Sequence, residues 1–233
     1  MNVKRNSIQV VLFDAVGTLL QPYPQVIDVY HRVGQHFGSR LPVHVIEQRF
    51  RQAFQRHYVA AGLNTSETME RLRWRSVVAE VFSDIEDVEG GLFTMLWEHF
   101  AMAKHWRVFD DVVAALRVVQ RHHLQVGIAS NFDMRLKPIA SELLPMIQSD
   151  HVFCSSSLGF NKPHQDFFRT IEEELSLNPE QILLVGDDGK NDLCGATKAG
   201  WHALLVDRHR THVEANVLHS LEELDTWFDE RSE

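Results

Sequence analysis

The sequence predicts an α/β protein, with a doubly wound, Rossmann-like core around a parallel sheet and an all-helical domain inserted into it. Two observations support this. From about residue 106 onward, short apolar runs that fit buried strands alternate with single helix patterns, which is typical of parallel sheets with right-handed crossovers. Residues 21–105, in contrast, show helical periodicity throughout. We therefore expect a core domain of residues 1–20 and 106–233, and a helical cap domain of residues 21–105.

The composition excludes several classes of protein. The net charge of −9 disfavours nucleic acid as a partner. Cys154 and Cys194 form no CxxC motif, which indicates a reducing compartment and no cysteine-based metal site. No apolar run approaches the roughly 18 residues that a membrane span needs, and Asp14 interrupts the only N-terminal one. We expect a cytoplasmic protein that binds neither nucleic acid nor membrane, as a monomer or a homodimer.

The first strand is expected at Val10–Phe13, an apolar, β-branched run suited to burial on both faces of a sheet. Asp14 follows at once, and Gly17 and Thr18 indicate a turn. A carboxylate at the carboxyl end of a central parallel strand lies where open α/β sheets bind their ligands. The alternative is an aspartate that only ends the strand.

Four helices are expected in the cap: 26–37, 42–61, a third begun by a capping box of Asn64 and Glu67, and 92–100. We interpret their aromatic stripes as bundle core rather than a cofactor site. Arginines between Arg49 and Arg75 would either pair along exposed faces, for example Arg71 with Glu67, or reach over the active site to select an anionic substrate. Segments at Pro22 to Pro24 and 106–109 would be hinges.

The second half should supply the remaining strands and helices of the core. In chain order we expect a helix capped by Asp110 or Asp111, a strand at 124–130, a helix at 136–144, a strand at 151–154, a polar loop, a helix at 165–175, a strand at 182–185, a helix at 190–199, a strand at 202–206 and a last helix capped by Ser220 and Glu223.

Polar groups follow three of these strands. Asp14 follows the first, Ser130 and Asn131 end the second, and Asp187 follows the 182–185 strand with Asp192 five residues on. Because these strand ends meet at one edge of a parallel sheet, the three carboxylates should lie close together and repel one another. A hard divalent cation, most simply Mg²⁺, would relieve that repulsion.

These motifs together resemble the haloacid dehalogenase superfamily, in the subfamily I arrangement with a helical cap between the first two motifs. The four matching motifs occur in order as Asp14-Ala-Val-Gly-Thr-Leu19, Ser130-Asn131, Lys162-Pro163, and Gly186-Asp187-Asp188 with Asn191-Asp192. The segment 130–136 further resembles the branch called haloacid dehalogenase-like hydrolase domain-containing protein 3. The resemblance implies a hydrolase, and for phosphatases of the superfamily a small phosphorylated metabolite as substrate.

The resemblance also implies roles at the site. Asp14 would attack phosphorus and form an aspartyl-phosphate. Mg²⁺ would be bound by the Asp14 carboxylate, the backbone carbonyl of Val16, and Asp187, with Asp192 a ligand or an orienting group.

The resemblance also gives roles to the remaining polar residues of the motifs. Ser130 and Lys162 would hold the phosphoryl oxygens, and Asn131 would help to position the nucleophile. Thr18 would be a structural hydroxyl of the turn or a hydrogen-bond donor to Asp14.

One residue departs from the pattern of the phosphatases. They usually carry a second aspartate, the general acid and base, where this chain has Val16. This leaves open a substrate with a good leaving group such as an acyl phosphate, an acid from elsewhere such as His164, or a protein that binds phosphate compounds with little turnover.

The same departure brings other members of the superfamily into question. A metal-independent dehalogenase also lacks the acid, but there the resemblance predicts Ser at position 187. A phosphonate-cleaving enzyme would need a cap lysine, and the insert contains only Lys104. We rank a Mg²⁺-dependent phosphatase first, a weakly catalytic binding protein second and a dehalogenase third.

Overall fold

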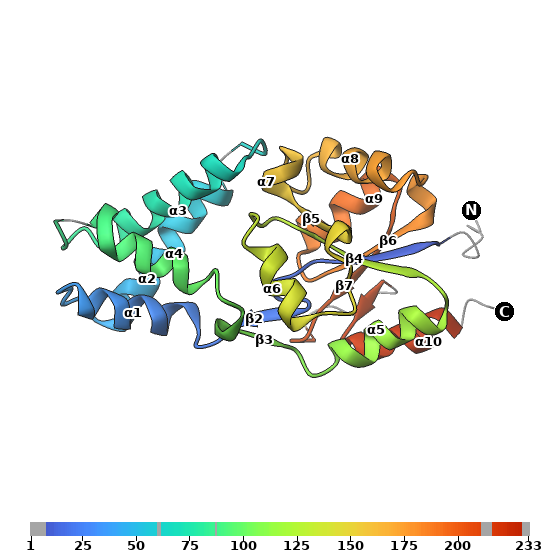
Figure 1. Cartoon of the computed structure of the whole chain (residues 1–233), viewed down its shortest axis with the longest axis horizontal. Helices are drawn as coiled ribbons and strands as arrows, with labels where there is room; N and C mark the ends of the chain where they lie inside the picture. Colours follow the sequence, from blue (N-terminus) through green and yellow to red (C-terminus); the bar gives the residue numbers. More distant parts are fainter. Residues whose placement is uncertain (1–7, 60–61, 87, 211–215, 230–233) are drawn as a thin grey trace.

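A central parallel sheet organises the molecule, as the sequence predicts (Figure 1). The computed structural model describes residues 8–59, 62–86, 88–210 and 216–229. In the order β5-β4-β1-β6-β7-β8, the six strands are β5 Val152–Cys154, β4 Gln125–Ser130, β1 Val10–Phe13, β6 Ile182–Gly186, β7 His202–Val206 and β8 Val217–Leu218. Every neighbouring pair is parallel. The sheet therefore has one edge at which all the strands end.

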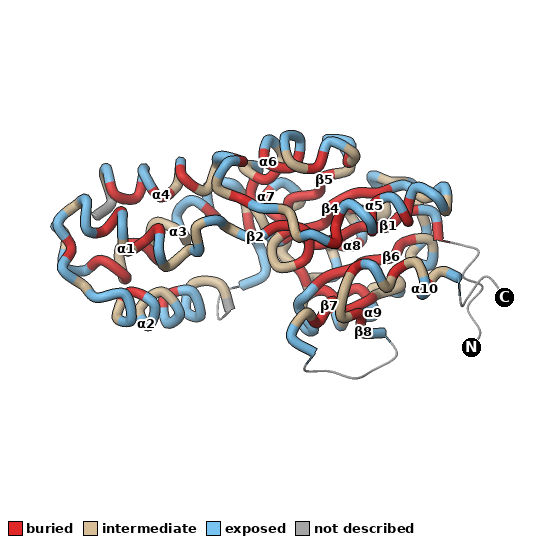
Figure 2. The backbone as a smooth tube through the Cα atoms, turned by 90° about the horizontal axis from the view of Figure 1, so that it is seen from below, coloured by how far each residue is buried: buried red, intermediate tan, exposed pale blue. Residues whose placement is uncertain are grey.

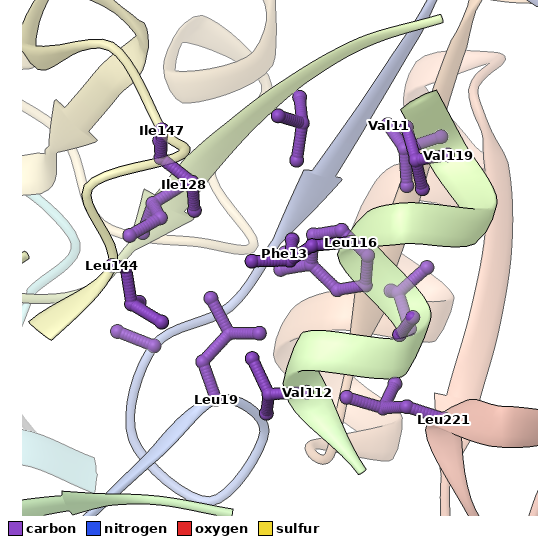
Figure 3. Close-up of a cluster of buried hydrophobic side chains, with 14 of the residues drawn as sticks. Val11, Phe13, Leu19, Val112, Leu116, Val119, Ile128, Leu144, Ile147 and Leu221 are labelled. Carbon is purple, nitrogen blue, oxygen red and sulfur yellow. The ribbon is translucent and has the colours of Figure 1, made fainter. Parts of the chain in front are cut away.

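Strand β1 lies at the centre of this sheet. Phe13 is paired with Ile128 of β4 on one side and with Val185 of β6 on the other, so the three strands end nearly level. All four residues of β1 are buried. Phe13 packs into the cluster under α5, where Figure 3 shows it beside Leu116. Its neighbour Leu12 faces the opposite cluster under α8 and α9.

Helices cover both faces of the sheet, which explains the continuous apolar run in β1. α5, α6 and α10 cover one face, and α8 and α9 the other (Figure 1). The core helices are α5 Val112–Arg121, α6 Leu136–Leu143, α7 Ser155–Leu158, α8 Gln165–Leu175, α9 Gly195–Ala199 and α10 Leu224–Asp229. A π-helical turn, Gly189–Cys194, leads into α9, and 3₁₀ turns lie at Ser149–His151, Pro179–Gln181 and Leu221–Glu223.

The cap is a separate helical layer with its own buried cluster, which includes Tyr30 and Phe82. Its helices are α1 Val26–His36, α2 Val43–Phe54, α3 Glu67–Val81 and α4 Phe93–His99, with π-helical turns at Gln55–Val59 and Val88–Leu92 and a 3₁₀ turn at Ala103–His105. Figure 2 shows buried and exposed residues alternating along these helices, while buried residues dominate the strands of the core. None of the described helices has the length and apolar character needed to cross a membrane.

The two segments that connect cap and core pair with each other. Strands β2 Leu20–Pro22 and β3 Trp106–Val108 form an antiparallel ladder in which Pro22 lies opposite Trp106. Hinges, but no strands, are expected here, because Pro22 and Pro24 interrupt regular structure. The ladder coincides with the expected limits of the cap, and those limits remain a prediction.

Several expected caps and helix limits are wrong. Ser66, rather than Asn64, is the N-cap of α3, because its hydroxyl accepts a hydrogen bond from the Met69 amide at 3.2 Å. Glu67 cannot complete a capping box because its carboxylate accepts hydrogen bonds from the core, from the Met134 amide and the Ser156 hydroxyl. The carboxylate of Asp111 does not cap α5 either; it is bound by Arg208 and by the Leu221 amide.

Smaller differences concern single elements. The expected polar loop after residue 154 contains the short helix α7. The helix expected at 190–199 is the π-helical turn followed by α9. Ser220 caps the last turn through the Glu222 amide, and Glu223 accepts from the His219 amide. Ala61, expected at the end of the second cap helix, lies outside the described residues.

Candidate active site

One cavity is lined by every residue that is expected to act as nucleophile, phosphate ligand or metal ligand. It has a volume of about 550 Å³ and lies between the cap and the carboxyl edge of the sheet. The expected site residues that line it are Asp14, Val16, Ser130, Asn131, Lys162, Asp187 and Asp192. The level ends of β1, β4 and β6 bring the first, second and fourth motifs together, and the loop between α7 and α8 supplies the third.

Lys162 connects two of the carboxylates. Its Nζ atom donates to Asp14 Oδ1 at 2.7 Å, to Asp192 Oδ1 at 2.6 Å and to the Ala129 carbonyl at 2.7 Å. Burial alone would lower the pKa of Lys162, but Asp14 and Asp192 raise it well above the ordinary value. Lys162 is therefore a fixed cation. Because an ammonium group has three donors, all of them are used within the protein.

Asn131 holds the backbone of Lys162. Its side-chain oxygen accepts a hydrogen bond from the Lys162 amide at 2.7 Å, and its side-chain nitrogen donates to the Lys162 carbonyl at 3.0 Å. Asn131 is thus linked to Asp14 through Lys162 rather than directly. Ser130, the residue before Asn131, is buried and lines the cavity.

Three carboxylates meet at the sheet edge. One oxygen atom from each of Asp14, Asp187 and Asp192 lies within 4.8 Å of the others. Part of the Asp187 side chain reaches solvent, yet desolvation and the charges of Asp14 and Asp192 raise the pKa of Asp187 to about 7. Burial likewise raises the pKa of Asp192, which Lys162 only partly opposes.

A divalent cation fits this cluster. Lys162 compensates only one of the three negative charges when all three aspartates are ionised, so two remain uncompensated. Clustered carboxylate oxygens are the ligands that Mg²⁺ prefers. A second cluster in the described part of the chain, His122 with Asp225 and Asp229, lies away from the cavity lining.

The turn after Asp14 is held against Asp187. Thr18 donates to Asp187 Oδ1 at 3.2 Å, and not to Asp14. At Gly17, where φ is +94°, a Cβ atom would lie 2.1 Å from an oxygen of Asp187. Only glycine fits this position, because it tolerates the left-handed backbone and leaves room for the carboxylate.

Arg208 is a supporting residue that the sequence analysis missed. Its guanidinium donates to the Thr18 carbonyl at 2.8 Å and to the Gly17 carbonyl at 3.4 Å, and it is paired with Asp111 at 2.6 Å. Burial acts to raise the pKa of Asp111, but hydrogen bonds from Arg208 and Leu221 lower it overall. No sequence signal joins residues that are 97 and 190 positions apart.

Two weaker candidates have structural roles. Asp188 caps the turn that follows it, because its carboxylate accepts from the Lys190 and Asn191 amides at 2.8 and 2.9 Å. His164 caps α8 by accepting from the Asp166 amide at 3.1 Å. His164 is not among the residues that line the cavity.

The cap side of the cavity is largely aromatic. Seven of the expected bundle-core aromatics also line the cavity, namely Tyr30, Phe50, Phe54, Tyr58, Phe93, Trp97 and Phe100, and Trp74 of the cap joins them. The cap arginines do not line it: Arg71, for example, covers the rings of Phe93 and Trp97. The arginine of the lining is Arg135, from the core.

Known proteins resemble this chain in sequence. A family model described as haloacid dehalogenase-like hydrolase matches residues 8–200. Haloacid dehalogenase-like hydrolase domain-containing protein 3 of Xenopus laevis is 28% identical over 211 residues, which cover 86% of this chain and 84% of the relative.

Solved structures share the fold. The putative HAD-hydrolase YfnB from Bacillus subtilis, determined with bound magnesium, has a TM-score of 0.72 at 18% identity and covers 95% of this chain and 99% of its own. The L-2-haloacid dehalogenase from Xanthobacter autotrophicus, with chloropropionic acid covalently bound, has a TM-score of 0.70 at 19% identity and covers 95% and 98%.

Proposed function

The chain belongs to the haloacid dehalogenase-like hydrolases, and on this premise we propose that it is a Mg²⁺-dependent phosphatase of small phosphorylated metabolites with Asp14 as its nucleophile. The observation that supports this most is the cluster of Asp14, Asp187 and Asp192 around a single buried ammonium. The cluster offers oxygen ligands and uncompensated negative charge, which suit a divalent cation and a phosphoryl group better than a halogenated acid.

The reaction would proceed in two displacements. Asp14 attacks phosphorus, the bond from phosphorus to the leaving oxygen breaks, and that oxygen keeps the electron pair. Water then attacks phosphorus, which releases inorganic phosphate and restores the Asp14 carboxylate. The hydrogen bond from Lys162 to Oδ1 fixes the carboxylate and leaves Oδ2 as the attacking atom.

The remaining site residues would position the substrate and neutralise its charge. These two effects supply most of the rate in phosphoryl transfer. Mg²⁺ held by Asp14, the Val16 carbonyl, Asp187 and Asp192 would offset the charge of the phosphoryl oxygens. Ser130 would donate to one of those oxygens. Lys162 would approach the phosphoryl group only by giving up one of its three present partners.

A panel of phosphate esters and acyl phosphates tests the proposal. With Mg²⁺, the wild type should hydrolyse at least one class, Asp14→Asn should lower kcat by about 10³-fold or more, and a chelator should abolish turnover. Turnover that survives in Asp14→Asn would contradict the nucleophile. Halide release without Mg²⁺ would instead support a dehalogenase.

The second candidate is a binding or regulatory protein with weak turnover. Val16 favours it, because valine cannot transfer protons and positioned acid–base catalysis contributes about 10²- to 10⁴-fold. Calorimetry with inorganic phosphate separates the two. Mg²⁺-dependent binding without turnover of any substrate in the panel would support this candidate over the phosphatase.

A further inference from the structure

We infer that the cavity selects phosphomonoesters whose leaving group is an uncharged aromatic ring system. This inference rests on the proposed phosphatase function and names its substrate class. Three features support it: the aromatic side chains of the cap, the internal pairing of the charged groups near them, and the absence of a proton donor at position 16.

Four aromatic residues form one continuous surface, which we call the aromatic wall. Phe50, Phe54 and Tyr58 recur every four residues along α2 and the π-helical turn, and Trp74 of α3 lies against them. Ring centroids are 4.8 Å apart for Phe54 and Tyr58 and 5.3 Å apart for Tyr58 and Trp74. All four residues line the cavity. A planar ring could stack on this wall, and offset or edge-on contacts between aromatic rings add to simple burial.

The charged groups near the wall are already paired. Glu70, the charged residue among the described cap residues that line the cavity, accepts from Arg73 at 2.7 Å and from the Tyr58 hydroxyl at 3.0 Å. On the core side, Arg135 is held by both oxygens of Asp133 at 2.7 Å.

This pairing restricts the body of the substrate. A carboxylate or second phosphate against the wall would lose its water without gaining a cation from the cap, because no lysine or arginine among the described cap residues lines the cavity. The exposed Lys190 lines it from the core. A sugar would likewise find few hydrogen-bond partners, since the Tyr58 hydroxyl already donates to Glu70. An uncharged apolar ring has no charge or hydroxyl group that would lose its water at the wall.

The chemistry at position 16 leads to the same class. When Asp14 displaces an aryl phosphate, the phosphorus–oxygen bond breaks and the electron pair stays on the phenolate oxygen, which afterwards takes a proton from water. A phenol has a pKa near 10, so phenolate leaves without the proton donor that Val16 cannot provide. An alkoxide would need that donor. A cavity of about 550 Å³ falls within the usual range for small-ligand sites.

The test compares four substrates with Mg²⁺: 1-naphthyl phosphate, glucose 6-phosphate, 2-phosphoglycolate and acetyl phosphate. Acetyl phosphate has a good leaving group but no ring to reach the wall, so its hydrolysis tests the proposed phosphatase alone. The inference predicts a kcat/KM for 1-naphthyl phosphate at least about 10-fold above those for the sugar and the carboxylated substrate.

Trp74→Leu should raise the KM for 1-naphthyl phosphate by about 3- to 10-fold, which is the effect expected from losing one aromatic contact. The KM for acetyl phosphate should stay unchanged. The control Leu72→Ala alters an exposed residue of the same helix outside the cavity lining and should change neither. Phe54→Arg, at a partly exposed position of the wall, should raise the kcat/KM for 2-phosphoglycolate relative to that for 1-naphthyl phosphate.

The outcomes separate the inference from the function. Equal effects of Trp74→Leu on both substrates, or a wild-type preference for the sugar or the carboxylate, would overturn the inference while the phosphatase stands. If none of the four substrates is hydrolysed, the phosphatase fails. The same ranking is then measured as affinity by calorimetry, and tighter binding of 1-naphthyl phosphate than of glucose 6-phosphate would still support the aromatic site.

Discussion

Lys162 illustrates how one buried residue affects both the charge and the stability of the site. Its ammonium is buried, bonded to Asp14 and Asp192, and held in place through its backbone by Asn131. Removing one partner of a buried ion pair leaves an uncompensated charge, which is far more costly than never having buried the pair. Lys162 therefore affects stability as well as chemistry.

We predict that Lys162→Met lowers the free energy of unfolding of the metal-free protein by about 3–5 kcal/mol. Mg²⁺ should restore more stability to this variant than to the wild type, because the cation replaces the lost positive charge. Urea denaturation with and without Mg²⁺ measures both effects. The control Lys190→Met removes an exposed lysine of the same cavity and should change stability by less than about 0.5 kcal/mol.

Val16 gives the second prediction at this scale. Val16→Asp should raise kcat for an alkyl phosphate by about 10²-fold or more, because it supplies the proton donor for a poor leaving group. The gain should be smaller for an aryl phosphate. Val16→Asn has a similar shape without a transferable proton and should give no gain. Equal rates for the two variants would show that proton transfer at this position does not limit turnover.

The sequence located the residues of the site better than their partners. Asp14, Ser130 and Asp187 could be placed together because each follows a buried strand, and parallel strands end at one edge. Two sets of hydrogen bonds could not be predicted: those of Asn131 with the backbone of Lys162, and the one from Arg208 to the Thr18 carbonyl. They depend on how separate loops fold over the sheet edge, which no local pattern encodes.

At the scale of elements, periodicity predicted the type of the long helices and strands and failed at their ends. The start of α3 shows why. Asn64 and Glu67 satisfy a capping-box pattern, yet the Glu67 carboxylate gains partners from the core and Ser66 becomes the cap. Tertiary contacts decided which of the two residues caps the helix. The β2–β3 ladder was missed for a related reason, since each strand has three residues and only its partner defines it.

The end of α4 carries a pH-sensitive contact. His99 is buried, its ring stacks on His105 with centroids 3.6 Å apart, and its Nε2 atom has no hydrogen-bond partner among the described residues. Burial, and then the charge of His105, lower the pKa of His99 to about 4. Between pH 4 and 6.5 the unfolded chain therefore binds a proton that the folded chain does not, and stability falls as the pH falls.

We predict that this histidine removes about 2 kcal/mol of stability between pH 7.5 and pH 5. His99→Phe keeps an aromatic ring without a titrating group, so its stability should depend on pH less than that of the wild type by about this amount. Denaturation curves at the two pH values provide the measurement. His44→Phe removes an exposed histidine of the cap and serves as the control. An unchanged pH dependence in His99→Phe would refute the assignment.

At the scale of the molecule, the cap rests on the segment that leads into Lys162. The Thr65 amide donates to the Gly159 carbonyl at 2.9 Å, and the Asn161 amide donates to the Leu63 carbonyl at 2.7 Å. Glu67 adds hydrogen bonds to Met134 and Ser156. The contact between cap and core and the placement of Lys162 therefore share one short stretch of backbone, and lifting the cap would expose that stretch.

The last prediction concerns this contact. Glu67→Ala removes the side-chain hydrogen bonds that Glu67 accepts from Met134 and Ser156, at a cost of about 1 kcal/mol to the closed arrangement. The backbone hydrogen bonds between cap and core remain, as does the one from Arg135 to the Trp97 carbonyl. The amides of Thr65 and Asn161 exchange with solvent only when the cap lifts, so their hydrogen-exchange rates should rise about fivefold. Amides within β1 and β6 should keep their rates, because the core does not open.

Glu47→Ala is the matched control, since the ion pair of Glu47 is with Arg51, inside the cap. It should leave both amides unchanged. Equal exchange in the Glu67 variant and the wild type would mean that the hydrogen bonds of Glu67 do not hold the cap closed. Faster exchange throughout the core would mean that Glu67 stabilises the fold rather than the closed arrangement, and the cap would then not move as a separate body on this contact.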